Sequence, residues 1–396
     1  MSNTQKKNVP ELRFPGFEGE WEEKKLGEVA KIYDGTHQTP KYTNEGIKFL
    51  SVENIKTLNS SKYISEEAFE KEFKIRPEFG DILMTRIGDI GTPNIVSSNE
   101  KFAYYVSLAL LKTKNLNSYF LKNLILSSSI QNELWRKTLH VAFPKKINKN
   151  EIGKIKINYP KKQEQQKIGQ FFSKLDRQIE LEEQKLELLQ QQKKGYMQKI
   201  FSQELRFKDE NGNDYPDWEN SKIEKYLKER NERSDKGQML SVTINSGIIK
   251  FSELDRKDNS SKDKSNYKVV RKNDIAYNSM RMWQGASGKS NYNGIVSPAY
   301  TVLYPTQNTS SLFIGYKFKT HRMIHKFKIN SQGLTSDTWN LKYKQLKNIN
   351  IDIPVLEEQE KIGDFFKKMD ILISKQKMKI EILEKEKQSF LQKMFL

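Results

Sequence analysis

Two polar segments carry the side chains best suited to chemistry, and the chemistry they suit is recognition of a nucleic acid. Residues 34–42 read Asp-Gly-Thr-His-Gln-Thr-Pro-Lys-Tyr, and residues 277–289 include Asn278, Arg281 and Trp283. Arginine with asparagine or glutamine can read the edges of bases, while cations clamp the phosphate backbone. Polar loops are common on any protein surface, so each segment alone leaves an ordinary solvated loop as an equal alternative.

Further contacts are expected in the loops at residues 138–144 and 335–340, which precede the last strand expected in each half of the chain. Side chains that donate hydrogen bonds or stack on bases are the candidates in all these segments. The predicted DNA-binding residues are Thr36, His37, Thr39, Lys41, Tyr42, Arg86, His140, Lys145, Tyr277, Asn278, Arg281, Trp283, Gln284, Lys289, Thr338 and Asn340.

Motifs that would support catalysis by this chain are missing or broken. Residues 285–290, Gly-Ala-Ser-Gly-Lys-Ser, look like a phosphate-binding loop, but Trp283 stands where its first glycine is required. His321 and His325 have helical spacing, yet no acidic residue lies between them and the sequence has no cysteine, which argues against zinc. The Asn/Asp-Pro-Pro-aromatic motif of amino-methyltransferases is not found either. We therefore expect no catalytic residue and no metal site in this chain.

The composition favours a folded protein with a polyanionic partner. The 396 residues carry a net charge of +19, and most of the excess lies in residues 1–159 and 204–353. Because neutralised phosphates release counterions, such a surplus favours nucleic acid over a protein that is merely basic. The 21 Phe and 17 Tyr residues can form large cores. The lack of cysteine, and of any apolar run near the ~20 residues that span a bilayer, predicts a cytoplasmic protein without membrane contact.

The chain consists of two tandem copies of one unit. Residues 160–201 align with residues 354–395 without a gap, and Glu-Gln, Ile-Gly and Phe-Phe pairs recur at the same positions. Upstream, Glu-Leu-Arg-Phe occurs at residues 11–14 and again at residues 204–207, whereas the middles of the copies diverge. Drift after duplication would blur the ends as much as the middles. A common scaffold with two different recognition surfaces explains the pattern better.

Two long charged helices are expected to follow the two globular modules. Residues 160–203 and 354–396 each carry one apolar stripe at steps of three, four and seven. At 1.5 Å per residue, each helix would be about 60 Å long. Such a helix needs a partner in water, and the simplest arrangement is an antiparallel coiled coil of the two. Packing of each helix on its own module, or parallel pairing, stays open as an alternative.

Both modules, residues 1–159 and 204–353, are predicted to be α+β domains. Runs of β-branched, aromatic and other apolar residues indicate strands near residues 47–52, 81–85, 240–244, 274–277 and 300–304. Helices are expected near residues 119–128 and 312–327. The predicted fold is therefore two tandem α+β domains separated by the two long helices.

At this point the motifs resemble a known family. Pro-x3-Glu-Gln-x2-Ile-Gly-x-Phe-Phe, which follows each module, is similar to the repeats of type I restriction-modification specificity subunits. Residues 34–40, 88–91 and 278–285 add to the resemblance, which covers essentially the whole chain. One departure is Lys161-Lys162, where the second copy has an apolar pair.

The resemblance implies a role for each part. Each module would be a target recognition domain that reads one half of a bipartite, asymmetric site on double-stranded DNA, and the helices would set the unread gap. Two methyltransferase subunits would methylate adenine N6 with S-adenosylmethionine, and two restriction subunits would use ATP and Mg to translocate and cleave DNA. No cofactor would belong to this chain. The residues expected to dock subunits on the helices are Phe171, Phe172, Ile179, Phe365, Phe366 and Ile373.

Two other functions stay open at this stage. One is a coiled-coil scaffold that binds proteins without reading DNA, and the other is a self-contained enzyme such as a nuclease fused to a binding module. The missing motifs count against the enzyme. A salt titration of DNA binding separates the scaffold from the specificity subunit, because phosphate contacts weaken steeply as salt rises.

Overall fold

The computed structural model describes residues 8–396 except residues 114, 256, 258, 259 and 337. The chain divides into two compact units, each made of two segments that are distant in the sequence. Unit 1 comprises residues 1–184 and 378–396, and unit 2 comprises residues 185–377. The first seven residues of the predicted N-terminal module, and residue 337 in the predicted loop at residues 335–340, lie outside the described part. No helix among the described residues is long and apolar enough to cross a membrane.

Unit 1 is built on an antiparallel four-stranded sheet with a smaller sheet beside it. The large sheet has the order β2 (Ala30–Asp34), β8 (Leu108–Thr113), β5 (Ile82–Ile87) and β6 (Asp89–Ile95). The smaller sheet has the order β4 (Tyr63–Ile64), β3 (Ile47–Leu50) and β7 (Phe102–Tyr104), with β3 and β7 parallel. A separate antiparallel pair joins β1 (Glu22–Lys25) to β9 (Lys156–Tyr159).

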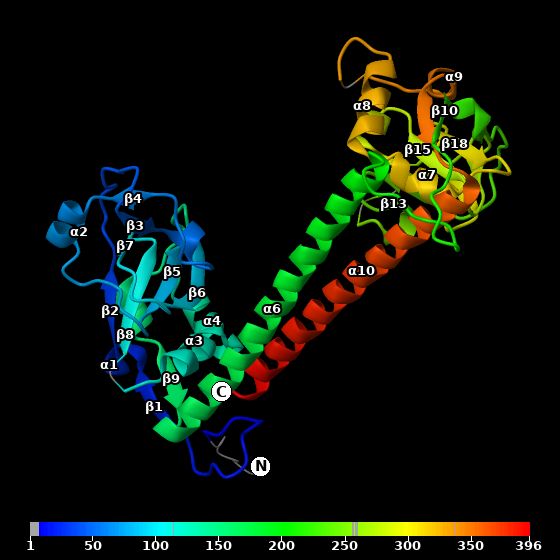
Figure 1. The fold of residues 1–396 in the computed structure, drawn as a ribbon. Helices are drawn as coiled ribbons and strands as arrows, with labels where there is room; N and C mark the ends of the chain where they lie inside the picture. Colours follow the sequence, from blue (N-terminus) through cyan, green and yellow to red (C-terminus); the bar gives the residue numbers. More distant parts are fainter. Residues whose placement is uncertain (1–7, 114, 256, 258–259, 337) are drawn as a thin grey trace, which may run out of the picture. The chain divides into compact units, whose positions relative to one another are not determined.

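The short α-helices among the described residues of unit 1 are α1 (Leu26–Val29), α2 (Glu66–Glu72), α3 (Ser118–Leu126), α4 (Ser128–Arg136) and α5 (Lys149–Gly153). Helix α3 begins where the Asn117 side chain accepts a hydrogen bond from the amide of Phe120. Helices α3 and α4 lie between the large sheet and the start of the first long helix (Figure 1). The main core lies on this side of the sheet, and a second core under β3, β7 and α2 includes the fully buried Phe69.

Unit 2 repeats this plan. Its four-stranded antiparallel sheet has the order β11 (Leu227–Glu229), β18 (Tyr300–Pro305), β15 (Ile275–Asn278) and β16 (Ser287–Lys289). Three antiparallel pairs accompany it: β12 (Leu240–Thr243) with β13 (Gly247–Lys250), β14 (Lys268–Val270) with β17 (Gly294–Val296), and β10 (Glu219–Lys222) with β19 (Asn350–Ile353). Its helices are α7 (Ser311–Lys317), α8 (His321–Asn330) and α9 (Tyr343–Leu346).

The two long helices are α6 (Lys162–Phe201) and α10 (Leu356–Lys393), and each of them contributes to both units. In unit 1 the start of α6 lies beside the end of α10, where Phe171 packs edge-on against Phe390 at 4.9 Å. In unit 2 the end of α6 lies beside the start of α10, where Tyr196 packs against Phe365 at 5.2 Å. Members of the two predicted apolar stripes also share one core in each unit: Ile168, Phe172 and Met394 in unit 1, and Ile200, Ile362 and Phe366 in unit 2.

The repeated sequence motifs form the same joint in both units. Arg13 donates from Nε and Nη2 to the two carboxylate oxygens of Glu164, each at 2.7 Å. Arg206 donates in the same way to Glu358, at 3.2 and 2.7 Å. Both carboxylates are buried, and these hydrogen bonds raise the pKa of each arginine. The repeated Glu-Leu-Arg-Phe segments therefore tie the start of each unit to the start of its long helix.

The glutamine after each of these glutamates anchors the helix to the module. Gln165 accepts a hydrogen bond from the amide of Asn117 and donates to the carbonyl of Pro160. Gln359 makes the matching bonds with the amide of Ser310 and the carbonyl of Pro354. Because Asn117 and Ser310 are the N-caps of α3 and α7, one buried side chain links two helix starts.

Most predicted elements are observed, with one correction. Strands β3, β5, β12, β15 and β18 lie in the five segments predicted as strands, and the mixed α+β character of both modules is confirmed. The single helix expected near residues 312–327 is wrong. It is two helices, because Thr320 starts α8 by accepting the amide hydrogen of Met323 on its hydroxyl.

Candidate nucleic-acid interface

Arg86, at the end of β5, organises the polar loops of unit 1. Its guanidinium pairs with the Asp34 carboxylate and donates from Nε to the carbonyl of Ile147 at 3.0 Å. Lys149 lies 3.5 Å from the other carboxylate oxygen of Asp34. Arg86 is buried and its guanidinium is taken up by these partners, so this predicted DNA-contacting residue lies beneath the surface. It positions the segment that begins at Asp34 and holds it beside the loop that ends at Ile147.

That second loop, residues 139–146, is named here the first bridged loop. The amide of Leu139 donates to the carbonyl of Lys146, and the amide of Gly88 donates to the carbonyl of Lys145. The Lys145 ammonium lies 4.5 Å from the centre of the Trp135 ring. His140 packs against the same ring at 4.3 Å. The predicted residues His140 and Lys145 are therefore exposed together beside α4.

The remaining predicted residues of unit 1 follow the segment at residues 36–42. Thr36 is half-buried, and its amide donates to the carbonyl of Tyr104, whereas His37, Thr39 and Lys41 are exposed. Tyr42 packs edge-on against Phe49 of β3 at 5.7 Å. This segment thus runs from the end of β2 to the smaller sheet, and it presents its polar side chains to solvent along that path.

In unit 2, the segment after β15 and a loop at residues 332–340 form the corresponding surface. This loop, named here the second bridged loop, is closed by two backbone hydrogen bonds between Gln332 and Asn340. Trp283 packs edge-on against Trp339 at 5.2 Å, and the Lys328 ammonium lies 5.6 Å from the Trp339 ring. The structure therefore brings the predicted residues Trp283 and Asn340 into one cluster.

Other predicted residues of unit 2 are placed differently. Arg281 and Thr338 are exposed, and Asn278 and Gln284 are half-buried. Tyr277, a predicted DNA-contacting residue, is fully buried, and burial raises the pKa of its hydroxyl. Both faces of β15 are covered, since Tyr277 and Ile275 lie in the main core of unit 2 and Ala276 lies in a second core.

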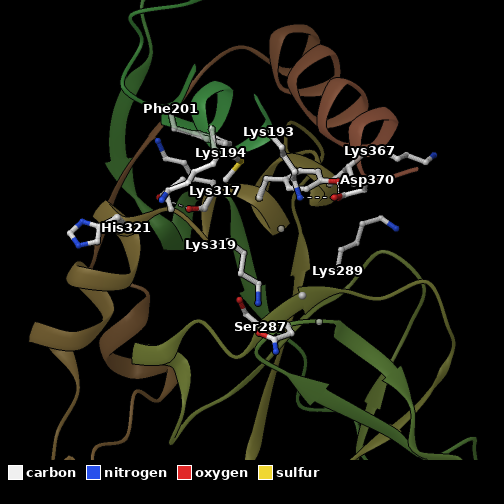
Figure 2. Close-up of a pocket in the computed structure, with 18 of the residues that line it drawn as sticks. Lys193, Lys194, Phe201, Ser287, Lys289, Lys317, Lys319, His321, Lys367 and Asp370 are labelled. Atoms are coloured by element: carbon white, nitrogen blue, oxygen red, sulfur yellow. Dashed lines mark hydrogen bonds and ion pairs between the residues drawn. The ribbon is translucent and has the colours of Figure 1, made fainter. Parts of the chain in front are cut away.

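A groove of about 1640 Å³ lies in unit 2 between the long helices and the module (Figure 2). It contains the predicted residue Lys289. The walls come from the end of α6, the start of α10, the turn at residues 244–248, β16 and the segment joining α7 to α8. Its cationic side chains are Lys193, Lys194, Lys199, Lys289, Lys317, Lys319, Arg322 and Lys367.

Cations in this groove are held close together with few acids to offset them. Burial lowers the pKa of Lys289, and the positive charges of Lys367 and Lys272 lower it further. Lys319 donates to the carbonyls of Ile244 and Gly285, and burial lowers its pKa to about 8. Figure 2 shows Lys193 meeting Asp370, one of two acidic residues that line the groove. A bound anion would relieve this repulsion, so the groove suits a phosphate backbone.

Four of the six predicted docking residues keep some exposure and two do not. Phe172 and Phe366 are fully buried, so these two predicted docking residues lie in the cores of the units. Phe172 packs with Phe395 inside unit 1, and Phe366 stacks on Phe201 inside unit 2. The half-buried residues are Phe171, Ile179, Phe365 and Ile373.

Sequence reasoning missed several surface residues that the structure exposes. Leu188 on α6 and Ile382 on α10 occupy matching positions of the repeat and are 54% and 56% exposed. Their matching positions in the repeat could have marked them as surface residues with a shared role. The groove lysines on the long helices, Lys193, Lys194, Lys199 and Lys367, were also not predicted, because no pattern in the sequence places them opposite β16.

Comparison with known proteins identifies the family. The family model described as the type I restriction modification DNA specificity domain matches twice, over residues 18–191 and 215–385. The chain belongs to this specificity family. The resemblance found in the repeats is thereby confirmed, including the presence of two copies. A protein of Methanocaldococcus jannaschii assigned as the type I restriction enzyme MjaX specificity subunit is 26% identical over 229 residues. That match covers 53% of each chain, so it spans about half the length of the relative.

Two solved structures from type I restriction-modification systems share the fold of this chain. The S subunit of a type I restriction-modification system from M. genitalium superposes with a TM-score of 0.61 at 15% identity, over 98% of this specificity-family chain and 99% of the other. A chain from a study of complex assembly and conformational transition in a type I system gives 0.53 at 16% identity, over 96% and 98%. At such low identity the likeness establishes the fold.

Proposed function

We propose that this chain is the sequence-specificity subunit of a type I restriction-modification complex and that each unit reads one half of a bipartite DNA site. The observation that supports this most directly is the contrast between joints and surfaces. The joints Arg13–Glu164 and Arg206–Glu358 are the same in both units, whereas the exposed loops differ in length and sequence. Because both modules are attached to their helices in the same way but present different loops, they suit two different half-sites on one duplex.

The DNA contacts would come from the loops described above. In unit 1 these are the segment at residues 36–42 and the first bridged loop, and in unit 2 the segment at residues 278–284, the second bridged loop and the cationic groove. The groove would hold phosphates, which position the protein, and the loops would reach base edges, which specify the sequence. Tyr277 and Arg86 are left out because both are buried.

The long helices would form an antiparallel coiled coil that fixes the distance between the half-sites. Their contacts in each unit fit this arrangement, since the start of one helix meets the end of the other in both cases. Ion pairs made by two aspartates, one on each helix, stabilise the contact between α6 and α10. Burial disfavours the charge of Asp176, but Lys122 and Lys387 outweigh burial and hold its pKa below the usual range. Asp370 pairs with Lys193 at 2.5 Å.

The catalytic partners would be two methyltransferase subunits, which use S-adenosylmethionine, and two restriction subunits, which use ATP and Mg. We propose Leu188 and Ile382 as part of the methyltransferase docking surface, because they occupy matching positions of the repeat, as two copies of one partner subunit require. Leu188→Lys and Ile382→Lys should each lower the number of methyltransferase subunits that co-purify. Gln191→Lys adds the same charge at an exposed polar position of α6 and should leave the number unchanged.

Mapping of methyladenine in the cell's DNA tests the proposed function. The expected result is a bipartite, asymmetric motif with an unread gap, and the motif should vanish when the gene is deleted. A continuous palindrome, or a methylome that ignores the deletion, would refute the proposal. Exchange of residues 30–150 for the module of another family member should change one half-site and keep the other.

The spacer role has a separate test. Adding one heptad to both long helices at matched positions keeps the apolar stripes in phase and adds about 10 Å. That length corresponds to about three base pairs, so the gap in the methylated motif should lengthen or methylation should be lost. An unchanged gap at full methylation would contradict the spacer role while leaving the reading of half-sites intact.

A further inference from the structure

Each of the two bridged loops has an exposed apolar side chain at its tip, and neither the reading of base edges nor phosphate binding requires one. Phe143 and Val141 in the first loop, and Leu334 in the second, are fully exposed. An exposed apolar side chain on its own is ordinary, because much of any protein surface is apolar. Here, however, the most exposed large apolar side chains of the described residues stand at the same place in both copies of the duplicated fold.

The equivalence of the two loops follows from the chain order and the hydrogen bonds. Each loop is followed by a short helix, a strand that pairs with the first strand of the unit, and a long helix. Each is also bonded to the end of the equivalent sheet strand. Ile147 donates its amide to the carbonyl of Arg86 in β5, and Leu341 donates its amide to the carbonyl of Ser279 just after β15. The loop sequences differ, yet both place an apolar side chain at the tip.

The bases of these loops are held by close contacts, whereas the side chains at the tips are exposed. In the first loop, Thr138 is buried and donates its hydroxyl hydrogen to the carbonyl of Leu134. In the second, a side chain on Gly333 would bring its Cβ within 2.6 Å of the Thr338 carbonyl oxygen, so the turn requires glycine. A tip held in this way loses little conformational entropy when it is buried in a partner.

We propose that Phe143 and Leu334 are apolar wedges that enter the stack of base pairs, one in each half-site. This inference rests on the proposed function. The surroundings favour DNA over a protein partner, because the first tip is flanked by Lys145 and Lys146 and the second loop is covered by Lys328 at Trp339. One or two side chains are too small for a stable protein interface, which needs about 800 Å² on each side. A single ring or branched chain is the size that separates two stacked base pairs.

Insertion would unstack one step of each half-site and bend the duplex. A distorted half-site lowers the cost of turning a target base out of the helix, which an enzyme acting on a base in a duplex must do. In this proposal the specificity subunit does more than locate the site: it prepares the duplex for its partner.

Fluorescence of 2-aminopurine, placed at successive steps of the mapped site but outside the methylated adenines, tests the wedges in the complete methyltransferase complex. Wild type should raise the fluorescence at one step in each half-site. Phe143→Ala should remove the rise in the first half-site only and Leu334→Ala in the second only, with DNA binding weakened about tenfold. Phe143→Leu should keep the rise. Phe79→Ala removes a phenylalanine that is 66% exposed elsewhere in unit 1 and should change neither signal.

A rise that persists in Phe143→Ala and Leu334→Ala would overturn the wedges while the proposed function stands. Loss of co-purifying methyltransferase in these variants would also overturn them, because the tips would then be protein contacts. If wild type fails to bind the mapped site, the proposed function fails and the wedges with it.

Discussion

The joint in unit 2 should be stronger than the joint in unit 1, although both use the same arginine–glutamate pair. Glu358 accepts three hydrogen bonds, from Nε and Nη2 of Arg206 and from the indole nitrogen of Trp218 at 3.2 Å. Glu164 accepts two, both from Arg13. The indole nitrogen of Trp21, which occupies the matching position, is buried and has no hydrogen-bond partner among the described residues.

The size of the difference follows from these contacts. Removal of the carboxylate in Glu164→Ala leaves a largely buried guanidinium, which costs about 3–5 kcal/mol in a buried ion pair. Arg13 keeps its bonds to the carbonyls of Glu18 and Gly19, so we expect about 3 kcal/mol. Glu358→Ala breaks an equivalent pair and also leaves the Trp218 indole unsatisfied. That loss adds about 1–2 kcal/mol, which gives about 4–5 kcal/mol.

Hydrogen exchange of the intact chain measures the opening free energy of each unit separately, with α3 reporting on unit 1 and α7 on unit 2. Glu164→Ala should affect α3, and Glu358→Ala should affect α7 by the larger amount. A cycle with Trp218→Phe isolates the indole contribution, because Glu358→Ala should cost less once the indole donor is gone. Equal costs for the two glutamates, or no coupling to Trp218, would refute this account of the joint.

Three further predictions concern the helices and the groove. Gly169→Ala would place a Cβ 2.5 Å from Oδ1 of Asn117, the cap of α3, and should destabilise the protein by about 2 kcal/mol, whereas Gly363→Ala meets only a movable leucine and should lower the Tm less. Phe395→Ala empties a buried site in unit 1 and should cost about 3–5 kcal/mol in hydrogen exchange of α3, with α7 unchanged. Burial lowers the pKa of Lys317 to about 8 from 10.5, so the unfolded chain binds more protons between these values. Wild type should therefore gain stability over Lys317→Met as pH rises from about 8 to 10.5, measured by denaturant unfolding.

The sequence predicted the elements of this fold well because their signals are local. Residues 162–201 and 356–393 form helices as the apolar stripe required, and the five predicted strands are present. The break at Thr320 was missed because apolar residues continue in helical phase across it, while a single hydroxyl at the start of α8 decides the boundary. A threonine is visible in the sequence, but only its hydrogen bond to a backbone amide shows that it starts a helix.

The candidate site was harder to predict because it depends on contacts between distant segments. Arg86 has the residue type of a base-reading side chain, yet its partner Asp34 is brought to it by the pairing of β2 and β5 with β8. Tyr277 was misplaced for a related reason, because β15 is covered on both faces by cores that distant segments build. Lys319 and Lys289 line the same groove only because α7 and β16 pack together.

The arrangement of the joints also explains why the ends of each copy repeat while the middles differ. Each unit contains the start of one long helix and the end of the other, so Phe395 completes the core of unit 1 and Phe201 completes that of unit 2. A substitution where a long helix meets its module would therefore change both the core of that unit and the contact between the two helices. A change in the exposed loops alters neither, because their tips contribute nothing to the core. Recognition can therefore diverge independently in the two units, provided that Arg13, Arg206 and their glutamates stay in place.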